Sequence, residues 1–179
     1  MNGIQRWIMI SSEVLTRILR RNKPDAIAVI KGNRQYPQLE GSVRFFRTPY
    51  EGVLVCAEVS GLPDRRSRMR SDFFAMHIHE KGDCSHAFEN VGMHYNPENM
   101  LHPYHAGDLM PLLSNDGYAW TAFYDERFTI GEIIGRSVII HSRRDDFTTQ
   151  PSGDAGEKIA CGAINPPFFS KDMELNSGK

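Results

Sequence analysis

The sequence predicts an all-β domain, an antiparallel sandwich or barrel, and three observations lead to this prediction. From residue 26 onward the chain is a series of short apolar runs. Glycine, proline and aspartate separate these runs, as in the turns between strands. Within 52–60, Val53, Val55, Ala57 and Val59 recur at every second position, as the buried face of a strand requires. Many short strands joined by turns are typical of antiparallel sandwiches and barrels.

An amphipathic helix is predicted before the strands, at residues 4–21. Apolar residues recur there at helical spacing, and arginines gather near the C-terminal end, where the helix dipole favours cations. The apolar positions are Ile4, Trp7, Ile8, Leu15, Ile18 and Leu19, and the arginines are Arg17, Arg20 and Arg21. Asn22 to Asp25 then end the helix. Such basic stretches often simply pack on a core, so we favour a docking helix over one that binds a membrane surface or a partner.

Eight strands are predicted after the helix. Their ranges are 26–31, 41–47, 52–60, 73–79, 109–113, 118–124, 136–141 and 159–164. The basic run Arg65 to Arg70 lies in a turn and is interpreted as a solvated loop. The chain is thus predicted to consist of a helical extension at 1–24, one domain at 25–165 and a polar tail at 166–179.

Composition limits the classes of partner. A formal net charge of −1 argues against a general nucleic-acid binder. The apolar run Trp7 to Ile10 is too short for a membrane span or a secretory signal. We therefore expect no nucleic acid, no membrane span and a cytoplasmic location. Cys56, in a predicted strand, is interpreted as a small buried residue rather than a reactive thiol.

The seven histidines indicate a metal site. All of them fall between positions 77 and 141. Side chains alternate along a strand, so His77 and His79 project from the same face. A loop rich in proline and asparagine adds three histidines and an aspartate, and His141 ends a later strand. Six imidazoles and a carboxylate exceed what one tetrahedral site needs, which indicates a nitrogen-rich site for one or two metals without assigning the ligands.

Five stretches resemble successive landmarks of the Cu,Zn superoxide dismutase family. They are AMHIHEKGDCS, GMHYNP, HPYHAGDL, GRSVIIHSRRDD and GDAGEKIACGAI, and the resemblance runs from about Ala26 to Ile164. It implies an eight-stranded Greek-key barrel of immunoglobulin-like architecture with long metal-binding loops. It also implies an oxidoreductase that converts superoxide to dioxygen and hydrogen peroxide, and it allows a homodimer.

The resemblance also implies a role for each site residue. His77, His79, His94 and His141 would bind copper, and His94, His102, His105 and Asp108 would bind zinc. His94 would then be shared between the metals and would leave copper to deliver a proton. Asp145 would tie a copper-binding imidazole to a zinc-binding one. Cys84 and Cys161 would form the family's disulfide, and His86 matches no ligand.

One position departs from the family pattern. Lys158 stands where the family usually has an arginine, beside copper, that attracts superoxide. Positive charge is kept, but an ammonium and a guanidinium are not equivalent donors. Because the positive charge is kept at this position, the resemblance implies that Lys158 acts in catalysis. Lys158 also favours, mildly, the alternative of a non-enzymatic relative that binds zinc but little copper.

Overall fold

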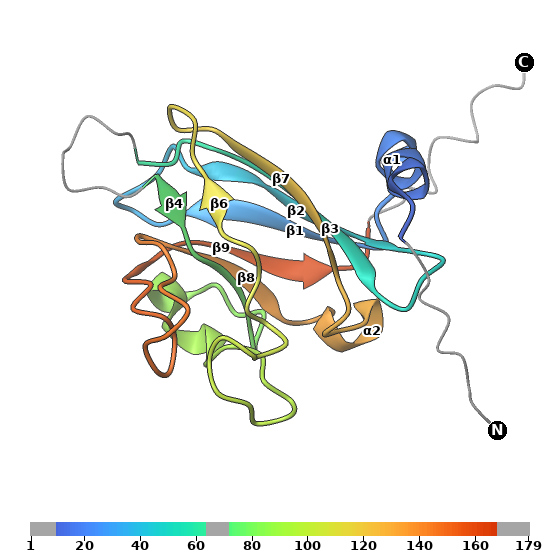
Figure 1. Ribbon diagram of the computed structural model, residues 1–179. Helices are drawn as coiled ribbons and strands as arrows, with labels where there is room; N and C mark the ends of the chain where they lie inside the picture. Colours follow the sequence, from blue (N-terminus) through green and yellow to red (C-terminus); the bar gives the residue numbers. More distant parts are fainter. Residues whose placement is uncertain (1–9, 64–71, 168–179) are drawn as a thin grey trace, which may run out of the picture.

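The computed structural model describes residues 10–63 and 72–167, and within them the chain is mostly β, as predicted. Seven antiparallel strands form a curled sheet in the order β5-β8-β9-β1-β2-β3-β7, and β4 and β6 pair in a short second ribbon (Figure 1). The strands are β1 (Ala26–Gly32), β2 (Glu40–Arg47), β3 (Val53–Ser60), β4 (Phe73–Phe74), β5 (Met76–His79), β6 (Leu112–Leu113), β7 (Ala119–Asp125), β8 (Ser137–His141) and β9 (Lys158–Asn165).

The β4–β6 ribbon links the two edges of the curled sheet. β4 is separated from β5 by Ala75 alone, and β6 leads into β7 through the turn Asn115 to Tyr118. β7 then connects through the short helix α2 (Ile130–Ile133) to β8, at the other side of the sheet. The Greek-key barrel prediction is confirmed, and each of the eight expected segments contains a strand. The segment 73–79 differs in being divided: β4 pairs with β6, β5 pairs with β8, and Ala75 between them bonds irregularly to His141 at the end of β8 and to Arg143 beyond it.

The core lies inside the curl of the sheet. Val53, Val55, Ala57 and Val59 of β3 are buried there, as their alternation predicted. Burying one such side chain contributes about 1.5–3 kcal/mol. The core therefore fixes which face of each strand looks inward, and with it the residues that β5 and β8 present on the outside.

The N-terminal helix α1 (Ser12–Arg21) packs on the outer face of the sheet. It begins later than the predicted 4–21, and residues 4–9 lie outside the described part of the chain. Its apolar side chains cover an outer cluster of the sheet, and this contact favours the docking interpretation. The contacting residues are Leu15, Ile18 and Leu19 of α1 and Phe46, Leu54 and Cys56 of the sheet.

Cys56 is buried, as expected, beneath α1. Burial raises the pKa of its thiol, which keeps the sulfur protonated and unreactive at neutral pH. The basic run 65–70 and most of the predicted tail lie outside the described residues, so the division at 1–24, 25–165 and 166–179 stays a prediction.

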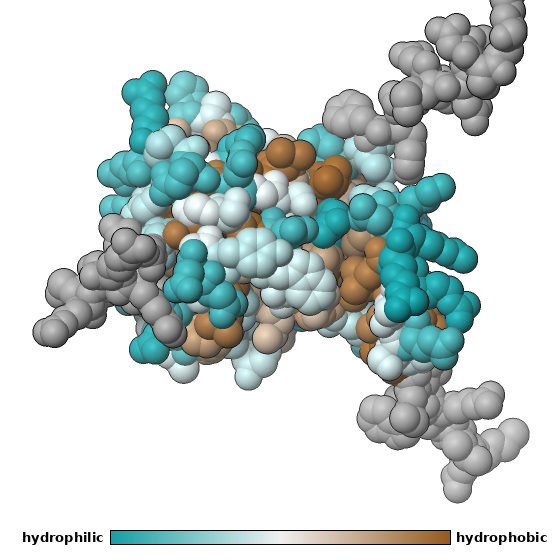
Figure 2. Space-filling model, turned by 90° about the horizontal axis from the view of Figure 1, so that it is seen from above, coloured by the Kyte–Doolittle hydropathy of each residue, from teal (hydrophilic) through white to brown (hydrophobic). Residues whose placement is uncertain are grey.

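The surface seen in Figure 2 is mixed, with hydrophobic patches separated by hydrophilic residues. Val29 and Trp120, on the outer face of the sheet, are each more than half exposed, at 58% and 52%. Among the described residues no helix has the length and apolar character needed to cross a membrane.

Candidate metal centre

β5 and β8 place three imidazoles on the outside of the barrel. Met76 and Ile78 of β5 point into the core, so His77 and His79 point the opposite way, as the alternation predicted. β8 runs antiparallel beside β5 and ends at His141, whose N–H donates to the carbonyl of Ala75 at 2.9 Å. All three histidines are nonetheless buried, because loops cover this side of the sheet.

The loop between β5 and β6 folds back on the free edge of β5. The N–H of Ile78 donates to the carbonyl of Gly107, and the N–H of Tyr95 donates to the carbonyl of Ile78, both at 2.8 Å. A side chain at Gly107 would not fit, since its Cβ would lie 2.3 Å from the Ile78 oxygen. These backbone contacts bring His94 and Asp108, the neighbours of Tyr95 and Gly107, beside the histidines of β5.

Two groups of four metal-ligating side chains result, and His94 belongs to both. Within each group the candidate ligand atoms lie within 4.8 Å of one another. The His94 ring centroid is 3.9 Å from that of His77 and 5.5 Å from that of His105. The first group is His77, His79, His94 and His141, and the second is His94, His102, His105 and Asp108. His86 is exposed and outside both groups.

The ring nitrogens of these groups fit bound metal ions. Five buried ring nitrogens have no hydrogen-bond partner in the described part of the chain: His77 Nδ1, His79 Nε2, His102 Nδ1, His105 Nδ1 and His141 Nε2. Leaving a buried polar atom unpaired costs about 1–3 kcal/mol. Two of the five nitrogens, His102 Nδ1 and His105 Nδ1, lie 3.0 and 3.2 Å from a carboxylate oxygen of Asp108 without forming a hydrogen bond. Ring nitrogens and a carboxylate oxygen gathered in this way fit bound cations. Imidazoles with one carboxylate suit zinc, and an imidazole-only set suits copper.

Asp145 joins the two groups from the loop between β8 and β9. Its carboxylate oxygens lie 2.8 Å from Nε2 of His77 and 2.8 Å from Nε2 of His102. The backbone N–H of Phe147 also donates to it, at 2.7 Å. Each of these imidazoles is therefore turned so that its Nδ1 faces the other members of its group.

Burial keeps the imidazoles in the form that binds metals. Burial, with smaller contributions from neighbouring imidazoles, lowers the pKa of His79 to about 2 and that of His141 to about 4, although hydrogen bonds to the carbonyls of Gly92 and Gly156 oppose these shifts. For Asp108, burial raises the pKa, but the hydrogen bond from His94 and the surrounding imidazoles outweigh it and lower the pKa. At neutral pH the site thus offers neutral nitrogen donors and one carboxylate.

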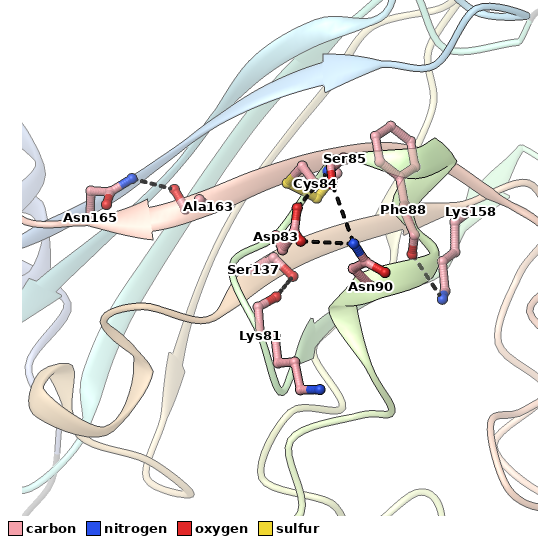
Figure 3. Close-up of a disulfide and its surroundings, with 11 residues drawn as sticks. Lys81, Asp83, Cys84, Ser85, Phe88, Asn90, Ser137, Lys158, Ala163 and Asn165 are labelled. Carbon is pink, nitrogen blue, oxygen red and sulfur yellow. Dashed lines mark hydrogen bonds between the residues drawn. A yellow bond between two sulfur atoms is a disulfide. The ribbon is translucent and has the colours of Figure 1, made fainter.

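The expected disulfide between Cys84 and Cys161 is present (Figure 3). It ties the loop after β5 to β9, with a Cα–Cα distance of 5.8 Å. Phe88 and Val91 of the same loop pack in one apolar cluster with the disulfide. Gly92 follows in the same loop, and its carbonyl lies 2.9 Å from Nδ1 of His79. The disulfide therefore supports the orientation of a candidate copper ligand.

Lys158 lies beside the first group, at the start of β9. It is the strand partner of His141, and its Nζ donates to the carbonyl of Phe88 at 3.2 Å (Figure 3). Burial lowers the pKa of the ammonium, whereas Glu89 opposes that shift. Lys158 and Phe88 both line a groove of about 1140 Å³. The ammonium thus lies near His141, beside this groove, which Glu89 and Glu157 also line and which none of the candidate copper ligands lines.

Several positioning groups were not predicted from the sequence. Gln150 accepts from the backbone N–H of His102 at 3.1 Å and donates to its carbonyl at 2.7 Å. Arg127, after β7, donates to the carbonyls of His105 and Asp108. Neither residue has a sequence signal, because a polar residue in a turn looks the same whether it binds solvent or a distant backbone.

The family comparison matches residues 39–164 to copper/zinc superoxide dismutase. Extracellular superoxide dismutase [Cu-Zn] of Drosophila melanogaster is 34% identical over 164 residues, which cover 80% of this chain and 87% of that protein. The copper chaperone for superoxide dismutase of Sus scrofa is 29% identical, over 80% of this chain and 54% of that protein. The chain spans about half the length of the mammalian relatives it matches. A crystal structure of the clock protein EA4 superimposes with a TM-score of 0.68 and 30% identity, covering 81% of this chain and 96% of that one.

Proposed function

Since the chain belongs to the copper/zinc superoxide dismutase family, we propose that it is a superoxide dismutase whose two metals share His94. The observation that carries the proposal is the pair of buried four-ligand groups with one imidazole in common. The family and the donor atoms agree on copper and zinc as the cofactors.

The two groups divide the metals by donor type. The all-imidazole group, His77, His79, His94 and His141, would hold copper, and the group containing Asp108, with His94, His102 and His105, would hold zinc. Copper, when bound, would supply one-electron chemistry, by which one superoxide is oxidised to dioxygen and a second, with that electron and two protons, is reduced to hydrogen peroxide. Asp145 keeps His77 and His102 oriented, because each donates its Nε2 hydrogen to one carboxylate oxygen.

His94 is the residue we assign to proton transfer. Its ring lies against both groups, with Nδ1 2.7 Å from Asp108. An imidazole is the side chain best suited to hold and release a proton near neutral pH. With one nitrogen fixed on the zinc side, the other nitrogen can give a proton to the reduced product and regain one from solvent.

Lys158 is the residue we assign to anion attraction. Its ammonium has three N–H donors, and one is directed to the Phe88 carbonyl. The remaining donors and the positive charge are available to superoxide in the groove. A cation in a cleft can raise the encounter rate of a small anion by roughly 10–1000-fold, and superoxide dismutases are themselves a well-known example of this effect.

The test combines metal analysis with superoxide consumption. The reconstituted protein should hold one copper and one zinc per chain and should consume superoxide. His94→Ala should abolish superoxide consumption and disrupt both metal sites, because it removes the ligand that they share. His86→Ala should leave the activity and the metal content unchanged, since His86 is exposed and belongs to neither group. A folded protein that binds zinc alone under copper excess would refute the proposal.

A non-enzymatic role is the second candidate, because some relatives are copper chaperones. A protein that delivers copper must release it to another protein, whereas four buried imidazoles favour a resident ion. The two functions differ in one measurement. Loaded protein that transfers copper to a metal-free acceptor but consumes no superoxide would support delivery.

The compartment is a separate proposal. The cytoplasmic location expected from the sequence stays a prediction. The disulfide Cys84–Cys161 and relatives named as extracellular dismutases favour an oxidising compartment instead. A homodimer also stays a prediction, which sedimentation of the metal-loaded protein would test.

A further inference from the structure

Among the residues that the structure describes outside the two metal-ligating groups, Arg127 makes the largest set of polar contacts. Its guanidinium forms a two-point ion pair with the carboxylate of Asp125, with Nε at 3.0 Å and Nη2 at 2.6 Å. From the same group, Nη1 donates to the carbonyl of His105 at 3.2 Å, and Nη2 donates to the carbonyl of Asp108. One side chain therefore joins the end of β7 to two candidate zinc ligands.

The ion pair gives this side chain a fixed position. Asp125 is the last residue of β7, and its side chain is only 5% exposed. The backbone N–H of Arg127 also donates to this carboxylate, at 3.0 Å. A guanidinium is planar and presents its donors in a rigid fork. The barrel thus fixes the position of the Arg127 guanidinium, and the guanidinium in turn holds the carbonyls of His105 and Asp108.

The carbonyls belong to a tight turn whose geometry matters for zinc. His105 and Asp108 are three residues apart, and the N–H of Asp108 donates to the carbonyl of His105 at 3.2 Å. The N–H of His105 donates to the carboxylate of Asp108 at 3.1 Å. By comparison, the neighbouring loop tip is open, with Leu101 and Tyr104 exposed by 69% and 68%. The turn is also bonded to β5 through Gly107, so Arg127 adds a second attachment, from the end of β7, that reaches the carbonyls of both ligands.

We infer that Arg127 is a positioning residue for zinc, which sets the spacing of His105 and Asp108 through their backbone carbonyls. The inference rests on the proposed zinc ligands and adds a residue that binds no metal itself. It differs from a merely structural role in one respect. Loss of the fork should change the affinity and coordination geometry at the zinc group while the barrel remains folded.

Arg127→Lys is the informative variant. A lysine keeps a positive charge beside Asp125 but has no fork to reach both carbonyls. Contacts that orient metal ligands typically contribute about 10–100-fold to metal affinity, and we expect a loss of that size for zinc. Zinc added to the metal-free protein in competition with a chelator measures this loss of affinity. Cobalt(II) bound in place of zinc should give an altered visible spectrum, and copper affinity should stay at the parent value.

Arg47→Lys is the matched control. Arg47, the last residue of β2, forms an exposed ion pair with Asp25 and is separated from Asp125 by strand β3. It should keep the parent zinc affinity and cobalt spectrum. A second variant, Asp125→Asn with Arg127→Gln, removes the ion pair without leaving a buried unpaired carboxylate, and it should reproduce the loss seen with Arg127→Lys.

The outcomes separate this inference from the proposed function. If Arg127→Lys and the double variant bind zinc and cobalt as the parent does, the inference is wrong even where their melting temperatures fall. If the parent binds no zinc, or if His105→Ala leaves zinc binding unchanged, the proposed ligand set fails, and the role of Arg127 fails with it. Weaker zinc binding with an altered cobalt spectrum in both variants supports it.

Discussion

The metal-free protein should lose stability steeply between pH 6.5 and pH 5. His79 and His141 have folded-state pKa values of about 2 and about 4, against an ordinary value of 6.5. Below pH 6.5 the unfolded chain therefore binds protons that the folded chain does not, so unfolding is favoured as the pH falls. The effect grows until the pH reaches the folded-state values.

The magnitude follows from these values. Each such imidazole costs about 1.4 kcal/mol for every pH unit below 6.5, which is about 2 kcal/mol at pH 5. The two together lower the free energy of unfolding by about 4 kcal/mol, a large part of the roughly 5–15 kcal/mol typical of a domain. The carboxylates do not interfere, because acid groups such as Asp83 and Asp108 have lowered pKa values and titrate below this window.

Urea unfolding of chelator-treated protein at pH 7.5, 6.5 and 5 provides the assay. The free energy should fall between the last two points and stay nearly constant between the first two. His141→Asn removes one titrating group and should reduce the drop by about 2 kcal/mol, while His77 and His105, whose pKa values burial also lowers, keep contributing to it. Equal midpoints at pH 6.5 and pH 5, with unchanged urea dependence, would refute the reasoning, because the imidazoles would then be as easily protonated in the folded state as in the unfolded one.

Three further predictions concern single features. Replacing Cys84 and Cys161 with serine should lower the free energy of unfolding by about 4.5 kcal/mol, since the bond joins residues 77 positions apart, and urea unfolding would show whether the loss is instead negligible. Lys158→Arg should raise the second-order rate constant for superoxide modestly, and Lys158→Glu should lower it sharply, with an effect that shrinks at high salt. If neither substitution changes the rate constant, Lys158 lies outside the path of the substrate. Gly153→Ala should weaken the binding of both copper and zinc, because a Cβ there would lie 2.0 Å from Oδ1 of Asp145, which contacts one ligand of each group. Unchanged affinities for copper and zinc would contradict this prediction.

The strands could be predicted because their signal is local. Alternation within β3 specifies which residues face the core, and the structure agrees. The division of the fourth expected strand at Ala75 was not predictable, since it depends on hydrogen bonds to a segment almost 70 positions away. The surface that α1 covers was likewise not predictable, because Leu15, Ile18 and Leu19 pack on residues of β2 and β3 that are distant in the sequence.

The candidate site was predictable only in part from the residues themselves. Strand alternation accounts for His77 and His79, but the loop ligands were assigned by resemblance to a family. The contacts of Arg127 and Gln150 had no local signal. Each binds a backbone carbonyl 19 to 48 positions away, and a backbone carbonyl carries no residue type that a sequence pattern could match.

The loop that carries the metal-ligating residues also covers an edge of the sheet. β5 pairs with β8 on one side, and on its other side the backbone of Ile78 is bonded only to Tyr95 and Gly107 of the loop. An uncovered strand edge presents free N–H and C=O groups that can template pairing with another chain. Loss of metal, which would loosen this loop, would therefore open a surface for edge-to-edge aggregation. In this protein, metal occupancy would protect solubility as well as chemistry.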